Sequence, residues 1–303
     1  MSLVDLLPVC SFRSVFRLPW GERFLDTIPK VLGSFHFWHP YLFRVQVHVV
    51  DHCNLNCRGC STYSPLVREG FADVKQVKKD LCELSRKLHV SVIGIIGGEP
   101  LLHPEIEALI CVARKAFPNA VLTLTTNGIL LPEKSRCFWD VVRDNKVRLI
   151  CSCYPPYLHK VAQWVRLAKK YGVKVFTVGR ESSHNWVVYH HSFRADASRQ
   201  EANYALCTSK IRCHRLWHSK LFLCNECCLQ HYNSYFGTNH QPIKGYDIYR
   251  YSGKELQKFM NQSDFACRYC TWVFPSLMTD WSYSKREKSE WCKEQEYTSK
   301  KDE

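Results

Sequence analysis

The chain has 303 residues, of which 46% are hydrophobic and 13% aromatic, so it can bury a core in one large domain or two smaller ones. Lys and Arg outnumber Asp and Glu by 42 to 28, and the formal charge of +14 suits an anionic partner such as a nucleotide-linked substrate. The basic residues are scattered along the chain, so a nucleic-acid partner is possible but has no support from clustering.

Seventeen cysteines raise the question of disulfides, zinc or iron–sulfur clusters. Disulfide frameworks belong to secreted chains, and the start of this one shows no basic region followed by an apolar one. The sequence contains no stretch of about 18 apolar residues, so no membrane span is predicted. We therefore expect a cytoplasmic protein whose reduced thiols serve as metal ligands.

The predicted elements begin after an aromatic and basic segment, residues 1–43, which we expect to dock on the main domain as an irregular segment broken by prolines. Residues 44–195 then show strands alternating with amphipathic helices. The predicted strands are 44–50, 90–96, 120–125, 147–153, 173–178 and 186–189, and the predicted helices are 72–88, 104–117, 133–145 and 157–171.

This alternation predicts an α/β fold with a parallel sheet and right-handed crossovers, curled or closed into a barrel. Active sites of such barrels lie at the carboxyl ends of the strands. The alternation of predicted strands and helices ends near residue 195. Residues 196–284 form a small cysteine-rich region, and residues 285–303 are a charged tail, expected to be a solvated helix or disordered.

The strongest motif follows the first predicted strand, where Cys53, Cys57 and Cys60 lie within eight residues. Three thiolates on one loop can wrap one face of a [4Fe–4S] cube, which normally takes four. One iron then stays open to bind a ligand. Zinc is the alternative, because His52 could act as a fourth ligand.

Further informative residues follow the ends of the next predicted strands. The second strand leads into Gly97, Gly98, Glu99 and Pro100. The third leads into Thr126 and Asn127, and the fourth into Ser152 and Tyr154. Taken alone, the glycines indicate a tight turn, and Asn127 followed by glycine indicates a turn pair.

Together these residues resemble the radical SAM superfamily, which has a Cys-x-x-x-Cys-x-x-Cys loop after the first strand; the resemblance covers about residues 44–190. It implies a partial (β/α)6 barrel that binds a [4Fe–4S] cluster with S-adenosylmethionine (SAM) on its open iron. The implied SAM contacts are Gly97, Gly98, Glu99, Pro100, Thr126, Asn127, Ser152 and Tyr154. Two residues depart from the family pattern: Gly59 replaces a frequent aromatic residue, and Tyr154 a frequent acidic one.

The cysteines beyond residue 196 resemble the SPASM or Twitch extension of some radical SAM enzymes, which binds an auxiliary [4Fe–4S] cluster. The resemblance implies Cys224, Cys267 and Cys270 as ligands, with Cys207 or Cys213 as the fourth. A zinc knuckle that also uses His214 or His231 is the alternative.

The resemblance implies reductive cleavage of SAM to a 5′-deoxyadenosyl radical that abstracts hydrogen from a substrate, with flavodoxin or ferredoxin as electron donor. Residues 51–66 also resemble an uncharacterised branch encoded beside glycosyltransferase genes. This implies a small-molecule or glycan-type substrate, first a sugar or nucleotide-sugar, and an oxidoreductase or an epimerase with Cys227 or Cys228 as hydrogen donor. The alternatives are a peptide-modifying maturase and a non-catalytic, metal-stabilised binding protein.

Overall fold

The computed structural model describes residues 40–179, 186–187, 198–207, 210–211, 213–270 and 278–291. The expected docked segment therefore lies outside the described residues except for its last four. The end of the charged tail, from residue 292, lies outside them as well.

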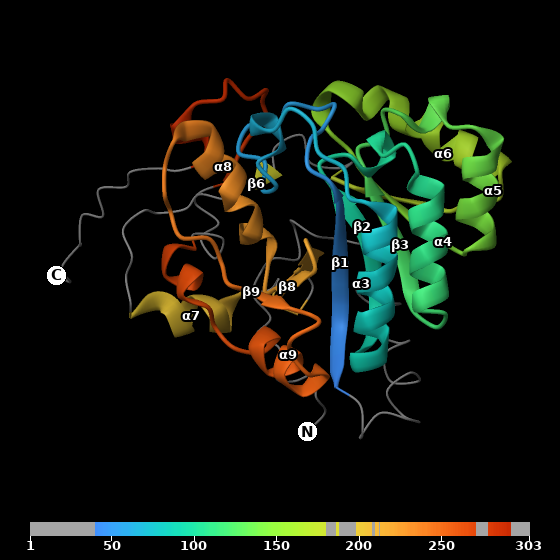
Figure 1. Ribbon diagram of the computed structural model, residues 1–303. Helices are drawn as coiled ribbons and strands as arrows, with labels where there is room; N and C mark the ends of the chain where they lie inside the picture. The colour runs from blue at the N-terminus through green and yellow to red at the C-terminus, as the bar shows by residue number, and fades with distance from the viewer. Residues whose placement is uncertain are drawn as a thin grey trace, which may run out of the picture. The chain divides into compact units, whose positions relative to one another are not determined.

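One eight-stranded sheet organises the described chain (Figure 1). Six neighbouring strands run parallel, in the order β5-β4-β3-β2-β1-β7, and β8 and β9 continue the sheet in antiparallel fashion. The outer strands β5 and β9 do not pair with each other, so the sheet is open, as a partial barrel requires. The strands are β1 (Tyr41–Val50), β2 (His89–Gly97), β3 (Val121–Thr126), β4 (Arg148–Ser152), β5 (Val175–Val178), β7 (His214–Trp217), β8 (Lys220–Phe222) and β9 (Gly245–Asp247).

Helices follow the first four parallel strands, as predicted. They are α3 (Val74–Lys87), α4 (Ile106–Ala116), α5 (Arg136–Asp144) and α6 (Val161–Lys170). In α3 the Asp73 side chain accepts hydrogen bonds from the first-turn amides of Lys75 and Gln76, which fixes where the helix begins. Its Val77, Leu81 and Leu84 are buried in the main core. The α/β fold predicted from the alternation is confirmed.

The identity of the sixth parallel strand differs from the prediction. Residues 186–189 were expected to supply it, but β6 (Trp186–Val187) pairs antiparallel with β10 (Met278–Thr279) in a separate two-stranded sheet, and residues 188–189 lie outside the described residues. The sixth strand is β7, which pairs parallel with β1. All four of its residues are buried, and a strand that short carries too few residues to show a period.

The β7–β8 hairpin has an unexpected turn. His218 and Ser219 both adopt positive φ angles, 47° and 58°, a pair of values found in type I′ turns. Such turns favour Asn-Gly, so neither residue signals a hairpin in the sequence. Because β7 pairs with β1, the sheet continues past the predicted boundary at residue 195.

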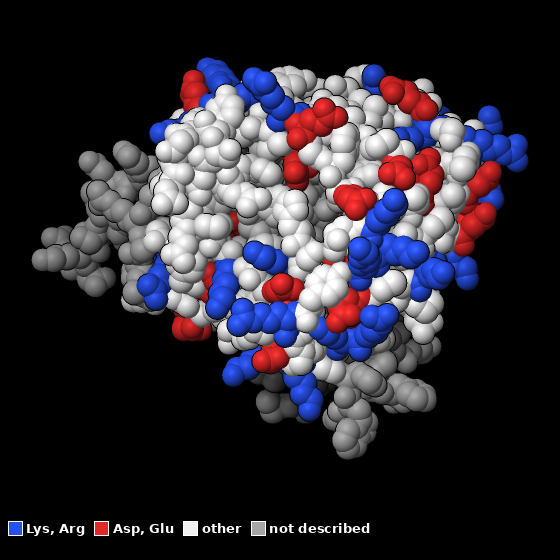
Figure 2. Space-filling model, viewed as in Figure 1, with Lys and Arg blue, Asp and Glu red and all other residues white. Residues whose placement is uncertain are grey.

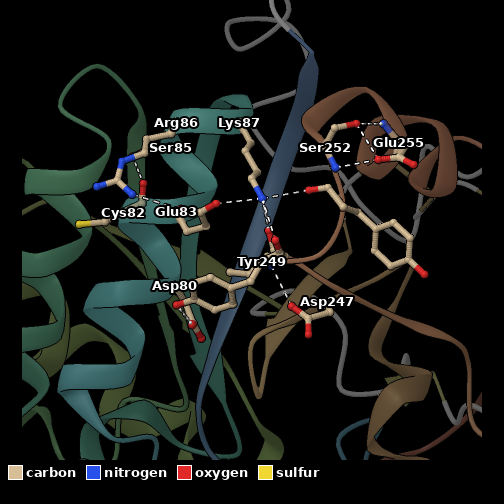
Figure 3. Close-up of polar contacts among 12 residues, drawn as sticks. Asp80, Cys82, Glu83, Ser85, Arg86, Lys87, Asp247, Tyr249, Ser252 and Glu255 are labelled. Atoms are coloured by element: carbon tan, nitrogen blue, oxygen red, sulfur yellow. Dashed lines mark hydrogen bonds and ion pairs between the residues drawn. The ribbon is translucent and has the colours of Figure 1, made fainter.

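A polar network fastens the segment after β9 to α3 (Figure 3). Lys87 Nζ donates to the carbonyl oxygens of Ile248 at 2.6 Å and Tyr251 at 3.0 Å, and pairs with Glu83 at 2.8 Å. The buried Asp80 accepts from the Tyr249 hydroxyl at 2.8 Å. The segment leads into α9 (Gly253–Met260), which begins with a capping box between Ser252 and Glu255.

The two remaining described α-helices lie in the cysteine-rich region: α7 (Arg199–Leu206) and α8 (Leu229–Phe236). None of the described helices is long and apolar enough to cross a membrane. In Figure 2, Lys and Arg side chains gather over the lower part of the face that carries α3 and α9. An open hollow of about 620 Å³ there is lined by Lys75, Gln76, Lys78, Lys79, Cys82, Glu83, Arg86 and Tyr249.

Candidate active site

The three cysteines of the first motif lie on the loop that leaves the carboxyl end of β1. Cys57 is buried, and Cys53 and Cys60 are half-buried. Burial, with the neighbouring Glu99 and Cys60 adding to it, raises the pKa of Cys53 to about 12. The pKa of Cys57 is also raised, first by burial and then by Cys60. The three thiols are thus close enough to repel one another when charged.

The two glycines at the end of β2 are required by close backbone packing rather than by a turn alone. A Cβ atom on Gly97 would lie 2.3 Å from the Val50 carbonyl oxygen, and one on Gly98 would lie 2.1 Å from the His52 oxygen. The amide of Gly98 donates to Val50 at 2.7 Å. The absence of side chains therefore lets the β2 end pack directly against the cysteine loop.

Glu99 is fully buried and joins the ends of two strands. Its Oε1 accepts from the Leu101 amide at 2.9 Å and the Thr126 hydroxyl at 2.7 Å, and its Oε2 accepts from the Asn127 amide at 2.7 Å. Burial raises the pKa of Glu99 to about 7, although these hydrogen bonds lower it in part. Pro100 is buried at the start of the short 3-10 helix that Glu99 caps.

Asn127 links the end of β3 to the cysteine loop. Its Nδ2 donates to Asn54 Oδ1 at 2.7 Å and lies 3.6 Å from Cys53 Sγ, while its Oδ1 accepts from the Ile129 amide. The Asn127 side chain therefore takes part both in the turn after β3 and in the cysteine loop, and its predicted contact with SAM stays a prediction.

Residues after β4 behave as the alternation of strand side chains predicts. The pKa of Tyr154 is raised first by burial and then by Cys57, Cys60 and Cys53, so its hydroxyl lies in the neighbourhood of the three thiols. Cys151 and Cys153 are buried in the main hydrophobic core. Ser152, at the end of β4, is half-buried.

The donor set fits an iron–sulfur cube better than a single zinc ion. His52 Nδ1 accepts from the Gly70 amide at 3.2 Å, and its ring packs edge-on against Phe71. Among the described residues no three His, Cys, Asp or Glu side chains converge on one point that could hold a metal ion. A cube needs no such convergence, because each thiolate binds a different iron.

Residues 285–289 are exposed, as expected of a solvated tail, but the two residues that follow them are buried. Trp291 is 1% exposed and Glu290 is 3% exposed. The Trp291 indole nitrogen donates to the Cys60 carbonyl oxygen at 2.9 Å. The high charge of the segment favoured solvent exposure, but Trp291 packs onto the cysteine loop. The sequence gives little sign of this contact, since Trp291 is the single aromatic residue of 285–291.

The C-terminal cysteines lie in one neighbourhood. The pKa of Cys224 is raised first by burial and then by Glu226, Cys270 and Cys267. That of Cys267 is raised to about 11 by burial, with Asp264 and Cys207 adding to it. Asn203 of α7 donates to the carbonyl oxygens of Cys267 and Cys270.

Cys213 also approaches this group. Arg215 pairs with Phe222 in the β7–β8 hairpin, and continuing that register sets Cys213 opposite Cys224. His214, in contrast, directs its Nδ1 at the Leu223 carbonyl oxygen, at 3.1 Å, and His231 lies 3.8 Å from Asp51. Neither histidine is therefore grouped with the C-terminal cysteines among the described residues.

A buried guanidinium lies beside the remaining pair of cysteines. Arg215 Nη1 is 3.6 Å from Cys228 Sγ, and Cys228 Sγ is 3.9 Å from Cys227 Sγ. The pKa of Arg215 is raised despite burial, because Cys228, Cys227, Cys213 and Cys224 surround it. The Cys227 hydrogen bond and the Arg215 charge lower the pKa of Cys228 against the effect of burial, whereas burial and Cys228 raise the pKa of Cys227.

Comparison with known proteins agrees with this geometry. The sequence profile of the Radical SAM superfamily matches residues 47–202, just over half of the chain. The chain belongs to the radical SAM superfamily, a family of enzymes that bind a [4Fe–4S] cluster and SAM.

Its curated relatives include the FeMo cofactor biosynthesis protein NifB of Methanocaldococcus infernus, 28% identical over 146 residues, which cover 44% of this chain and 47% of NifB. GTP 3',8-cyclase 1 of Mycobacterium tuberculosis is 31% identical over 97 residues, which cover 30% of this chain and 27% of the cyclase. The matched segment thus spans less than half the length of either relative.

Among solved structures, the BtrN complex with AdoMet and 2-DOIA matches with a TM-score of 0.48 and 15% identity, over 76% of this chain and 93% of BtrN. The AdoMet-bound anSMEcpe structure matches with a TM-score of 0.37 and 23% identity, over 45% of this chain and 42% of that one.

Proposed function

We propose that this chain cleaves SAM reductively at a [4Fe–4S] cluster held by Cys53, Cys57 and Cys60. The observation that carries the proposal is the meeting of these thiols with Glu99 and Asn127 at the carboxyl ends of β1, β2 and β3. When bound, the cluster supplies the electron that breaks SAM into methionine and a 5′-deoxyadenosyl radical, which abstracts hydrogen from the substrate.

We assign the SAM contacts to residues at the same strand ends. Gly97 and Gly98 let the end of β2 pack against the cysteine loop that would hold the cluster, and neighbouring carbonyl oxygens accept from the ammonium group of SAM. A carboxylate can accept about four hydrogen bonds, and Glu99 accepts three, from Leu101, Thr126 and Asn127. We propose that the fourth comes from the ammonium group of SAM. Ser152 and Tyr154 complete the assignment, with Pro100 setting the course of the chain after Glu99.

For the second site we propose an auxiliary [4Fe–4S] cluster on Cys224, Cys267 and Cys270, with Cys207 or Cys213 as the fourth ligand. The mutual influence of these thiols on their pKa values supports this proposal. Near the substrate, such a cluster could accept an electron from a product radical and make the overall reaction an oxidation. Epimerisation would instead need a hydrogen-atom donor, for which Cys227 is the protonated candidate.

The proposed substrate is a sugar or nucleotide-sugar, with flavodoxin or ferredoxin as electron donor. The excess of basic residues supports an anionic, nucleotide-bearing molecule, and one relative is named for a reaction of GTP. A peptide-modifying maturase and a non-catalytic binding protein are the outcomes that testing must separate from this proposal.

Anaerobic reconstitution with dithionite and SAM tests the proposal. The wild-type chain should release 5′-deoxyadenosine, and Cys57→Ala should abolish it, while Cys82→Ala on α3 should not. Iron should be about eight per chain, falling to about four in Cys224→Ala. Deuterium transfer from labelled nucleotide-sugars into 5′-deoxyadenosine would identify the substrate. Zinc without iron at the first site would refute the proposed activity.

A further inference from the structure

Residues 280–291, which we call the C-terminal strap, pair with the cysteine loop like an added antiparallel strand. The Arg58 amide donates to the Ser282 carbonyl oxygen at 2.9 Å, and the Ser284 amide donates to the Asn56 carbonyl oxygen at 2.9 Å. Between them Cys57 lies opposite Tyr283. The strap lies well beyond the part of the chain that matches the superfamily profile.

Side-chain hydrogen bonds on both sides of Cys57 also hold the strap against the cysteine loop. The Asn56 amide nitrogen donates to the Ser284 carbonyl oxygen at 2.8 Å. At the other end, Trp291 donates to the Cys60 carbonyl oxygen and stacks on the buried Tyr63 with ring centroids 6.2 Å apart. Backbone and side-chain bonds therefore join the strap to the loop on each side of Cys57.

Trp281 lies two residues before Tyr283, so in the antiparallel pairing of the strap with the cysteine loop it is the diagonal neighbour of Cys57 on the same face. Its Nε1 is buried and has no hydrogen-bond partner among the described residues. The Tyr154 ring lies 6.3 Å from the Trp281 ring, so two aromatic rings flank the thiols. A buried N–H without an acceptor is destabilising, and an anionic acceptor beside it would remove that cost.

We propose that the C-terminal strap is part of the SAM-cluster site and that Trp281 donates its indole N–H to the Cys57 thiolate once that sulfur binds iron. This rests on the proposed function, because it requires the cluster. Hydrogen bonds to ligand sulfurs withdraw electron density and raise the reduction potential of a cluster. Trp281 is accordingly a positioning residue that makes the cluster easier to reduce.

The test compares midpoint potentials, measured by redox titration with electron paramagnetic resonance. All variants carry Cys224→Ala, so that the signal comes from the first cluster. Trp281→Phe keeps the ring and removes the N–H, and Trp139→Phe makes the same change in the core of α5. We expect Trp281→Phe to make the cluster about tenfold harder to reduce, a shift of about 59 mV for a one-electron couple. Trp139→Phe should leave the potential unchanged.

Equal potentials in the two variants, each with about four irons, would overturn the role of Trp281 while leaving the proposed function intact. A parent protein without iron would instead refute the proposed function. Hydrogen exchange on the metal-free, full-length wild-type chain tests the strap separately. The amides of Arg58 and Ser284 should exchange at least about tenfold more slowly than in an unstructured peptide. Exchange at the unprotected rate would show that the strap does not pair with the loop.

Discussion

Arg215 Nη1 donates a hydrogen bond to His48 Nδ1 at 2.9 Å in the interior of the sheet. Because a guanidinium has no acceptor, His48 Nδ1 carries no proton, and His48 Nε2 must donate to Asp51 at 2.8 Å. Burial raises the pKa of Asp51, but the His48 hydrogen bond and the nearby histidines His48, His231 and His218 together outweigh it, so the pKa is lowered. His48 is therefore neutral and hydrogen-bonds both to the buried Arg215 and to Asp51, which lies two residues before Cys53.

This arrangement predicts acid sensitivity. Burial lowers the pKa of His48 to about 4, below its ordinary value of 6.5. Between these values the unfolded chain binds a proton that the folded chain does not, so stability falls as the pH drops from 6.5 towards 4. Each pH unit costs about 1.4 kcal/mol, or about 2 kcal/mol at pH 5. Urea unfolding at pH 7.5 and 5 measures this loss.

His48→Gln is the matched variant for that measurement. The amide oxygen can accept from Arg215, and the amide nitrogen can donate to Asp51, yet glutamine does not titrate. We expect its stability to depend less steeply on pH than that of the wild type. Equal pH dependence of the two proteins would mean that His48 is not the group responsible.

Glu99→Gln should destabilise the chain by about 1–3 kcal/mol, because an amide nitrogen would replace one oxygen that now accepts from a buried donor. The affected donors are the Asn127 amide and the Thr126 hydroxyl. Glu105→Gln is the control, since Glu105 is exposed. Denaturant titration of the metal-free proteins measures both. If the two substitutions cost the same, the Glu99 bonds do not hold the strand ends together.

Gly98→Ala should destabilise the chain by about 1–3 kcal/mol and lower the iron bound at the first site, since its Cβ would overlap the His52 carbonyl oxygen. Gly94→Ala, on the same strand, should cost less, because its Cβ would meet the Thr123 hydroxyl at 3.1 Å. Iron analysis and thermal unfolding compare the two variants. Full iron content in Gly98→Ala would show that the cysteine loop can move aside.

Lys87→Met should cost about 1–3 kcal/mol, since it leaves the carbonyl oxygens of Ile248 and Tyr251 without their donor. Its neighbour Arg86 also pairs with Glu83 but is 75% exposed at its side chain. Arg86→Met should therefore change stability by less than about 0.5 kcal/mol. Unfolding in urea distinguishes the two, and equal losses would point to Glu83 rather than to the carbonyl oxygens.

The sequence predicted the parts of the site that depend on local order. Cys53, Glu99 and Asn127 each follow a strand, and parallel strands bring their carboxyl ends to one edge. The hydrogen bonds that join these residues could not be predicted, because each crosses between strands. In particular, the Glu99 carboxylate accepts three hydrogen bonds because it is fully buried among their donors.

The sequence did not predict contacts made by segments far apart in the chain. The β7 strand is four residues long, and its turn at His218 and Ser219 lacks the usual glycine. Trp281 and Trp291 stand in polar surroundings that favour solvent exposure. The burial of Trp291 depends on the shape of a cysteine loop that only the folded sheet creates, and Trp281 is half-buried beside the same loop.

The pairing of β7 with β1 has a consequence for any shortened form of the protein. β1 carries the cysteine loop, and β2 covers one of its edges while β7 covers the other. A fragment ending where the superfamily match ends, at residue 202, would leave a row of backbone amides and carbonyls on β1 exposed. Open edges of this kind recruit strands from other molecules, so such a fragment should self-associate rather than remain monomeric.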